Sequence, residues 1–290
     1  MTEILEPVLS LLKTQPYFLQ GVCLVLGLLI GSFLNVVIHR LPKMMERDWQ
    51  VSCLDLQGQA APDQPRYNLV IPRSSCPSCG HAISAWENIP VISYLCLRGK
   101  CKACQAPISA RYPLVELLTG GLAYSVAVQY GYSALTLFAL VFVFALVALT
   151  FIDFDTQLLP DDITLPLLWL GLLVNLQAGF TDITSAVIGA MVGYLVLWSV
   201  YWLFKLVTGK EGMGYGDFKL LAAIGAWFGW QLLPAVILLS SVVGSVIGLG
   251  LILLKGKTRH TAIPFGPFLA LGGIAALFYG QALAAFYLMP

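Results

Sequence analysis

The chain has 290 residues, of which 58% are hydrophobic and only 11% are charged. Soluble domains carry roughly 25% charged residues, so this composition excludes an ordinary soluble protein and indicates a membrane protein. The formal net charge is only +1, and no overall basic field points to nucleic acid as a partner.

Apolar stretches predict an all-α polytopic membrane protein with about eight transmembrane helices. The first stretch lacks the small-residue cleavage pattern of a signal peptide, so we expect it to be retained. The sixth is shorter than the ~20 residues that a crossing needs, and a hairpin or re-entrant segment, which leaves seven crossings, is the alternative. The predicted spans are residues 18–38, 113–131, 134–152, 163–180, 183–204, 218–230, 232–254 and 265–288.

The basic residues predict the orientation of these spans. Fifteen of the sixteen Lys and Arg lie in segments 39–112, 205–219 and 255–262, which eight crossings place on one side of the membrane. The positive-inside rule makes that side the cytoplasm. Both termini, with Lys13, are therefore expected on the opposite side.

The composition also predicts that the chain is divided into three parts. Residues 1–39 hold an N-terminal tail and the first transmembrane helix. Residues 40–112 are rich in proline and polar residues and contain no long apolar run, which is typical of a small extramembrane insert. Residues 113–290 hold the remaining spans and form the predicted membrane domain.

Two CxxC pairs lie in the insert, separated by 21 residues. Four thiolates at this spacing predict one structural zinc ion in a closed tetrahedral site of the zinc-ribbon kind. A metal would also stabilise a loop too small to build much of a core. The alternative is a pair of disulfides or four ordinary buried cysteines, which a reducing cytoplasm disfavours. The predicted ligands are Cys76, Cys79, Cys101 and Cys104, and the predicted non-ligands are Cys23, Cys53 and Cys96.

Acidic residues in or beside the spans are candidates for function, because a charge at membrane depth is costly. Asp153 follows the third span without a break, at a helix end whose dipole opposes an anion. The alternative for Asp153 is a solvated loop acid, since Asp155 and the residues after it resemble a loop. Glu116, at the start of the second span, could pair with Arg111 or hold a substrate.

The other acids stand where helices are expected to begin. Asp161 and Asp162 follow Pro160 and precede an apolar stretch, so we expect them to cap a helix. Asp217 ends the glycine-rich segment 212–217, and an N-cap is the alternative to a functional role for it as well.

Two aspartates that converge near the cytoplasmic face could share one proton, with one carboxylate activating water and its protonated partner polarising a carbonyl. The glycines beside Asp217 would let an extended substrate approach. Metalloprotease and serine protease chemistry are excluded because no His-Glu-x-x-His motif exists and no histidine lies at depth. The three histidines, all in loop or interfacial positions, are His39, His81 and His260.

Several motifs resemble those of bacterial type IV prepilin leader peptidases, a family of GxGD-type membrane aspartyl proteases. The resemblance spans nearly the whole chain. It rests on the two CxxC pairs and on segments 31–42 (GSFLNVVIHRLP), 111–116 (RYPLVE), 153–161 (DFDTQLLPD), 214–217 (GYGD) and 264–268 (PFGPF).

The resemblance implies that Asp153 and Asp217 are the catalytic pair of an endopeptidase, while Asp155 and Asp161 do not activate the water. It further implies a multi-pass protein of the bacterial inner membrane, with periplasmic termini. Such enzymes cleave the basic leader of prepilins and pseudopilins on the cytoplasmic side, in support of type IV pilus assembly or type II secretion.

Many members also methylate the new N-terminus with S-adenosylmethionine, an activity associated with the cysteine-bearing loop. We therefore expect a bifunctional peptidase and N-methyltransferase. No Rossmann-type glycine pattern marks a place for the methyl donor. Gly99 and Lys100, beside Cys101, are the candidates, and a basic turn in a zinc knuckle is the alternative for them.

Two functions from other classes remain as alternatives. A proton-coupled transporter would use the same acids as a relay, but it predicts an inverted repeat of broken helices that the sequence does not display. A non-catalytic scaffold would bind its partners through the zinc loop. The sequence does not indicate the oligomeric state.

Overall fold

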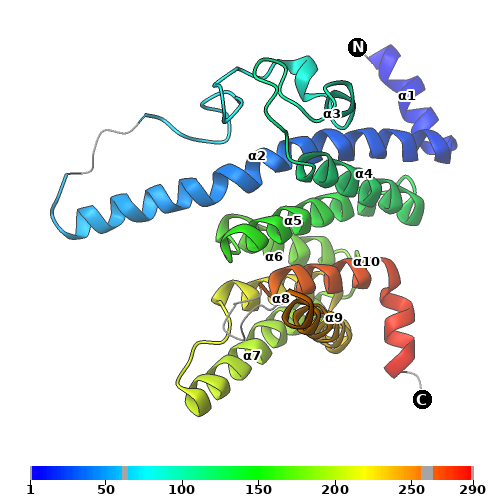
Figure 1. Cartoon of the computed structure of the whole chain (residues 1–290). Coiled ribbons are helices and arrows are strands. Elements are labelled where there is room, and N and C mark those ends of the chain that lie inside the picture. The colour runs from blue at the N-terminus through cyan, green and yellow to red at the C-terminus, as the bar shows by residue number, and fades with distance from the viewer. Residues whose placement is uncertain (1, 61–64, 256–263, 289–290) are drawn as a thin grey trace. The chain divides into compact units, whose positions relative to one another are not determined.

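The computed structural model describes residues 2–60, 65–255 and 264–288, and within these ranges the chain is helical apart from loops and two isolated β-bridges (Figure 1). Lys257, Arg259 and His260 lie outside the described residues. The elements are α1 (Thr2–Thr14), α2 (Pro16–Leu56), η1 (Ala85–Asn88), α3 (Ile92–Cys96), α4 (Arg111–Tyr130), α5 (Ala134–Thr156), α6 (Asp161–Asn175), α7 (Ile183–Thr208), α8 (Tyr215–Phe228), η2 (Trp230–Leu232), α9 (Leu233–Lys255) and α10 (Gly266–Leu288).

The all-helical membrane class predicted from the sequence is confirmed, and each of the eight predicted spans coincides with a helix. Among the described residues, five segments are long and apolar enough to cross a membrane. They lie in α2, α5, α7, α10 and the stretch that joins η2 to α9. Helices α6 and α8 have only 15 and 14 residues, so eight crossings stays a prediction.

The chain divides into two compact units, residues 1–136 and 137–290. In the first unit, α4 packs along α2 (Figure 1). Small residues allow the two backbones to approach closely, as is usual between membrane helices. A Cβ atom on Gly27 would lie 2.6 Å from the Cβ of Ala123 and 2.8 Å from the Cα of Gly120.

Helix α2 continues well beyond the apolar stretch that ends at residue 38. Its last turns, from Lys43 to Leu56, contain Met, Glu, Arg, Gln and Leu and no glycine, and these residues favour a helix in water as well as in a membrane. The insert predicted from residue 40 onward therefore begins as helix, and its irregular part starts only after residue 56.

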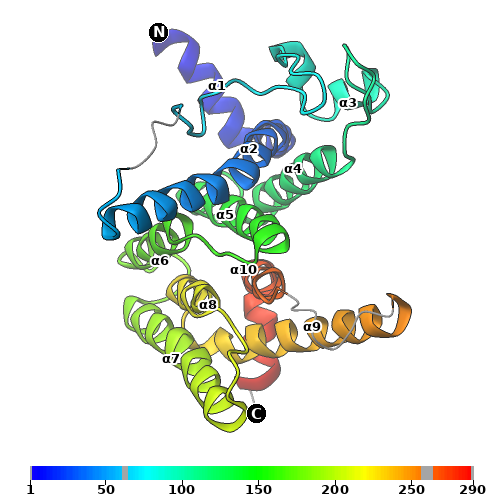
Figure 2. The ribbon, with the colours of Figure 1, turned by 60° about the vertical axis from the view of Figure 1, so that its left-hand side comes forward.

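The second unit is built around α8, whose residues from Phe218 to Phe228 are almost all buried. Helices α6, α7 and α10 pack against it, as Figure 2 shows. On α7, Gly189 faces Gly225 so closely that a Cβ on either residue would collide with the backbone of the other. Gly171 of α6 lies against the Trp227 ring, which donates a hydrogen bond of 2.8 Å from Nε1 to the Leu167 carbonyl.

We expect the substitution Gly189→Ala to destabilise the second unit, because its new methyl group would collide with the backbone of α8 at Gly225. Overpacking of this kind costs roughly 1–3 kcal/mol. Thermal unfolding of the detergent-solubilised protein measures the effect. Gly121→Ala on α4, where an added Cβ meets nothing within 4 Å, is the matched control and should cause no loss. Equal unfolding temperatures for Gly189→Ala and wild type would contradict the close contact.

Candidate functional site

The four cysteines of the two CxxC pairs meet in one cluster. Their Sγ atoms all lie within 4.8 Å of one another, with 3.8 Å between Cys76 and Cys104 and 4.0 Å between Cys79 and Cys101. Four sulfurs around an ion at about 2.3 Å form a tetrahedron with edges of about 3.8 Å. All four are free thiols, so the disulfide alternative is wrong and the cluster can hold a metal ion.

The two CxxC turns are built alike, which explains how distant parts of the loop present equivalent thiols. The N–H of Cys76 donates to the His81 carbonyl, and the N–H of Gly80 donates to the Cys76 carbonyl, both over 2.9 Å. In the second turn, Cys101 donates to Ala106 and accepts from Gln105, over 2.8 and 3.0 Å. Backbone hydrogen bonds from Ser78 and Cys79 lower the pKa of Cys76 to about 6, which favours the thiolate form that binds metals.

Glu87, which the sequence analysis missed, joins the two turns. Its carboxylate accepts hydrogen bonds of 2.8 Å from both the N–H and the hydroxyl of Ser84, and these bonds lower the pKa of Glu87 to about 2. The same carboxylate lies 3.4 Å from His81, beside the first turn, and 3.8 Å from Lys102, inside the second. The Ser-x-x-Glu spacing of 84–87, a capping box, was the signal available in the sequence.

Gly99 and Lys100, the candidates for the methyl donor, lie in the turn that leads into the second CxxC pair. Gly99 has a φ of +67° and donates its N–H to the Tyr94 carbonyl over 2.9 Å. Its own carbonyl accepts from Ile108, and Lys100 forms a β-bridge with Pro107. These contacts give both residues a role in the backbone of the turn.

Glu116 is buried in α4, where it fastens the loop to the helices. Its Oε2 accepts a hydrogen bond of 2.8 Å from the Val91 N–H, and its carboxylate also bonds to the Ser32 hydroxyl of α2. Val91 has a φ of +61°, a strained conformation for a β-branched residue. The carboxylate of Glu116 therefore holds the start of α3 in place within the first unit.

Asp153 and Asp217 lie together inside the second unit. Their residues are 4% and 7% exposed, and the two carboxyls are close enough to interact electrostatically. Asp153 lies near the end of α5 and accepts a hydrogen bond of 2.9 Å from the N–H of Gly266, the first residue of α10. The alternative of a solvated loop acid is therefore wrong for Asp153.

Asp217 lies in the first turn of α8, and the N-cap of that helix is Gly214, so the capping alternative is wrong for Asp217. Its Oδ1 is buried and has no hydrogen-bond partner among the described residues. A buried carboxyl oxygen without a partner costs free energy unless a water molecule, a proton or a ligand meets it. Within the pair, Asp153 therefore accepts a hydrogen bond from a backbone N–H, whereas Oδ1 of Asp217 has no hydrogen-bond partner among the described residues.

The glycines around the pair serve packing. A Cβ on Gly216 would lie 2.7 Å from the Cβ of Leu159, and a Cβ on Gly266 would lie 2.7 Å from Oδ2 of Asp153 and 3.1 Å from Leu159. The segment that follows α5 therefore needs both glycines to pass between α8 and α10. Gly214 is more open, with Oδ2 of Asp217 as the nearest atom at 3.9 Å.

Asp161 and Asp162 do not cap α6 as expected, because the N-cap residue is Pro160. They lie in the first turn, where the helix dipole stabilises an anion without a capping bond. Asp161 instead pairs with Lys219 of α8, whose Nζ lies 2.7 Å from both carboxylate oxygens. This ion pair joins the start of α6 to α8 two residues after Asp217.

Two family models match the chain. The Bacterial Peptidase A24 N-terminal domain matches residues 25–130, and the Type IV leader peptidase family matches residues 140–249. No solved structure matches.

Known proteins with the name prepilin leader peptidase/N-methyltransferase are similar over nearly the full length, and three of them illustrate the range of organisms. The protein of Aeromonas hydrophila is 58% identical over 97% of both chains. That of Pseudomonas aeruginosa is 53% identical over 97% of this chain and 98% of its own. That of Burkholderia pseudomallei is 53% identical over 92% and 86%. With this identity and the two matching models, the chain belongs to the type IV leader peptidase family.

Proposed function

We propose that this membrane protein is a bifunctional enzyme that cleaves the leader of prepilins and pseudopilins and then N-methylates the new N-terminus. The names of its relatives support both activities. They favour an enzyme over the transporter and scaffold alternatives. The observation that carries the peptidase activity is the buried, interacting pair of Asp153 and Asp217.

In this proposal, the surroundings of the two carboxyls support different roles for them in an aspartyl protease reaction. Asp153 accepts the N–H of Gly266 at the start of α10, and both this hydrogen bond and the helix dipole favour an ionised carboxylate. It is the base that takes a proton from the attacking water. Asp217 keeps Oδ1 unpaired, and as the protonated partner it donates a hydrogen bond to the scissile carbonyl.

The four clustered cysteines hold one zinc ion in this proposal. A closed site with four thiolates leaves no position for a substrate, so the ion is structural. It fixes the 40–112 part of the chain, which carries few buried apolar residues of its own. The membrane peptidase part is residues 113–290, and residues 1–39 carry the first span.

The methyl donor is S-adenosylmethionine. When bound, it would supply a methyl group whose carbon–sulfur bond breaks as the amine nitrogen forms the new carbon–nitrogen bond and releases a proton. The chain's own task is to hold the donor and to present the new N-terminus in its unprotonated form. The membership of the leader peptidase family favours a location in the bacterial inner membrane. The basic segments favour the zinc loop in the cytoplasm and both termini in the periplasm.

Asp153→Asn and Asp217→Asn should each abolish leader cleavage, because neither amide can exchange the proton that the pair must share. The expected loss is at least roughly a thousandfold. Cleavage of a prepilin in membranes carrying each variant measures it, and metal content confirms that the loop is folded. Asp162→Asn, a neighbouring acid that is exposed in the first turn of α6, is the matched control and should cleave normally. Full cleavage by Asp153→Asn or Asp217→Asn would show that the substituted residue is not part of the catalytic pair.

Metal analysis of the purified protein should find one zinc ion per chain. Cys101→Ser should lose the ion, because a serine hydroxyl is a far weaker ligand for zinc than a thiolate. Cys96→Ser provides the matched control, since Cys96 is an exposed cysteine of α3 outside the cluster. A chain without bound metal, or equal metal loss in both variants, would be inconsistent with the cluster as a zinc site.

A further inference from the structure

The two short helices between the CxxC pairs, η1 and α3, expose large apolar side chains. Trp86 of η1 is 81% exposed, and Ile92 and Leu95 of α3 are 59% and 66% exposed. The two helices contact each other, and the spacing of three residues places Ile92 and Leu95 on one face of α3. We call these three residues the insert patch. Large apolar side chains gathered on a surface mark a place of interaction, because water solvates them poorly.

The backbone that carries the insert patch is fastened to the cysteine cluster. Glu87 of η1 lies beside both CxxC turns, through its contacts with His81 and Lys102. The N–H of Gly99, in the turn that leads into the second CxxC pair, donates to the carbonyl of Tyr94 in α3 over 2.9 Å. The patch is therefore presented by the same scaffold that brings the four thiols together.

Hydrogen bonds place the start of α3 beside the apolar part of α2. Val91, which precedes α3, donates its N–H to Oε2 of Glu116 over 2.8 Å, and the same carboxylate bonds to the Ser32 hydroxyl of α2. Ser32 lies six residues before the end of the apolar stretch 18–38, a distance of about 9 Å along the helix. Helix α3 therefore begins level with the membrane-spanning part of α2, and not with the polar extension that follows it.

The backbone of α3 also meets the requirement of a lipid environment, where an N–H without a partner is costly. The N–H of Ser93 donates to the Ile89 carbonyl over 3.1 Å. That of Leu95 donates to the Val91 carbonyl over 3.0 Å, and residue 90 is a proline, which has no N–H. The start of α3 can therefore lie among lipids without an unpaired donor at these positions.

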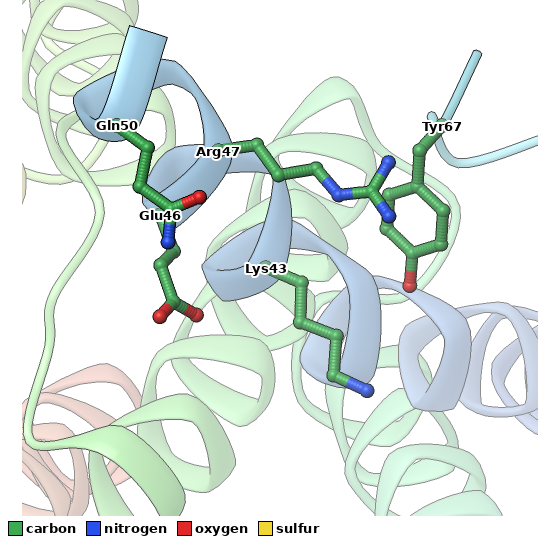
Figure 3. Close-up of a pocket in the computed structure, with 5 residues that line it drawn as sticks. All are labelled: Lys43, Glu46, Arg47, Gln50 and Tyr67. Carbon is green, nitrogen blue, oxygen red and sulfur yellow. The ribbon is translucent and has the colours of Figure 1, made fainter. Parts of the chain in front are cut away.

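The extension of α2 has a surface of the opposite character. A shallow hollow beside it, shown in Figure 3, is lined by Lys43, Glu46, Arg47, Gln50 and Tyr67. Charged and amide groups of this kind are well solvated by water, and the carboxylate of Glu46 would be repelled by anionic lipids. Polar residues thus cover the part of the first unit that extends beyond the apolar stretch, whereas the exposed apolar residues of η1 and α3 belong to the part beside it.

The charges beside the insert patch indicate which partner covers it. Arg98 and Lys100, both exposed, follow α3 directly. The interfacial layer of a bilayer offers acyl chains to apolar side chains and phosphate groups to basic ones, and tryptophan is enriched there. Leu29 and Phe33 of α2, close to Ser32 in the sequence, are exposed as well. The apolar surface of α3 therefore lies at the level of exposed apolar residues of a membrane helix.

We propose that the insert patch is a membrane anchor, in which Trp86, Ile92 and Leu95 enter the interfacial layer of the lipid bilayer. Arg98 and Lys100 contact the phosphate groups of the lipids. Because η1 and α3 are fastened to both CxxC turns, the anchor holds the cysteine cluster at the membrane surface. This inference concerns how the insert is placed, and it does not depend on the proposed enzyme activities.

The experiment is spin labelling of the full chain in phospholipid nanodiscs. Leu95→Cys, and separately Ile92→Cys as a second position on the same face, are labelled in a chain whose non-cluster cysteines are replaced by serine. The same chain without an added cysteine gives the background signal. Oxygen, which concentrates in lipid, and a water-soluble nickel chelate each relax the label, so the ratio of their effects reports whether the label lies in lipid or in water.

Two positions of α2 provide matched controls. A label at Val25, which is exposed within the apolar stretch, reports lipid. A label at Gln50, which is exposed about 18 Å beyond that stretch along the helix, reports water. The oxygen-to-nickel ratio for Leu95→Cys and Ile92→Cys should resemble that for Val25→Cys and be several-fold higher than that for Gln50→Cys.

Labels on α3 that the nickel chelate relaxes as strongly as it relaxes the Gln50→Cys label would overturn the proposal, because the insert patch would then face water. Labels shielded from both oxygen and the nickel chelate would overturn it as well, since protein and not lipid would cover the patch. A lipid-like ratio at either position of α3, with the expected ratios at both controls, would support the anchor.

Discussion

A carboxylate at the C-terminal end of a helix is opposed by that helix's dipole, and Asp153 occupies such a place in α5. In the second unit, the N-terminal end of another helix offsets this unfavourable interaction. Gly266 opens α10 and donates its N–H to Asp153, so the free donors and the positive dipole end of α10 stabilise the anion. Because Gly266 lies 113 residues further along the chain, this single hydrogen bond also fixes where α10 begins relative to α5.

The same constraint determines how tightly the rest of the unit must pack. Asp217 can face Asp153 only if α8 is buried among its neighbours, and a 14-residue helix buried on every side needs neighbours without side chains at the contacts. Gly189 on α7 and Gly171 on α6 supply those contacts. The glycines of this unit are thus a consequence of placing a short, buried helix, and with it the Asp217 carboxyl, at the centre of the unit.

Much of this arrangement could be predicted from local sequence, and the remainder could not for identifiable reasons. The cysteine cluster follows from spacing alone, and the cost of a buried charge marks Asp153 and Asp217 as candidates. The bond from Gly266 depends on a partner more than a hundred residues away, which no local pattern specifies. The extension of α2 beyond residue 38 was not predicted, because the sequence analysis followed the apolar stretch while helix propensity continues after it. Asp161 was expected to cap α6, and its true partner, Lys219, lies 58 residues further on.

The two groups of candidate residues lie in separate units of the chain. The aspartates belong to the second unit, whereas the cysteine cluster belongs to the first. Cleavage creates the very amine that methylation consumes, so the product of one site is the substrate of the other. Separate residues then allow each site its own electrostatics. The aspartate pair is buried within its unit, whereas two cysteines of the cluster, Cys79 and Cys104, are exposed.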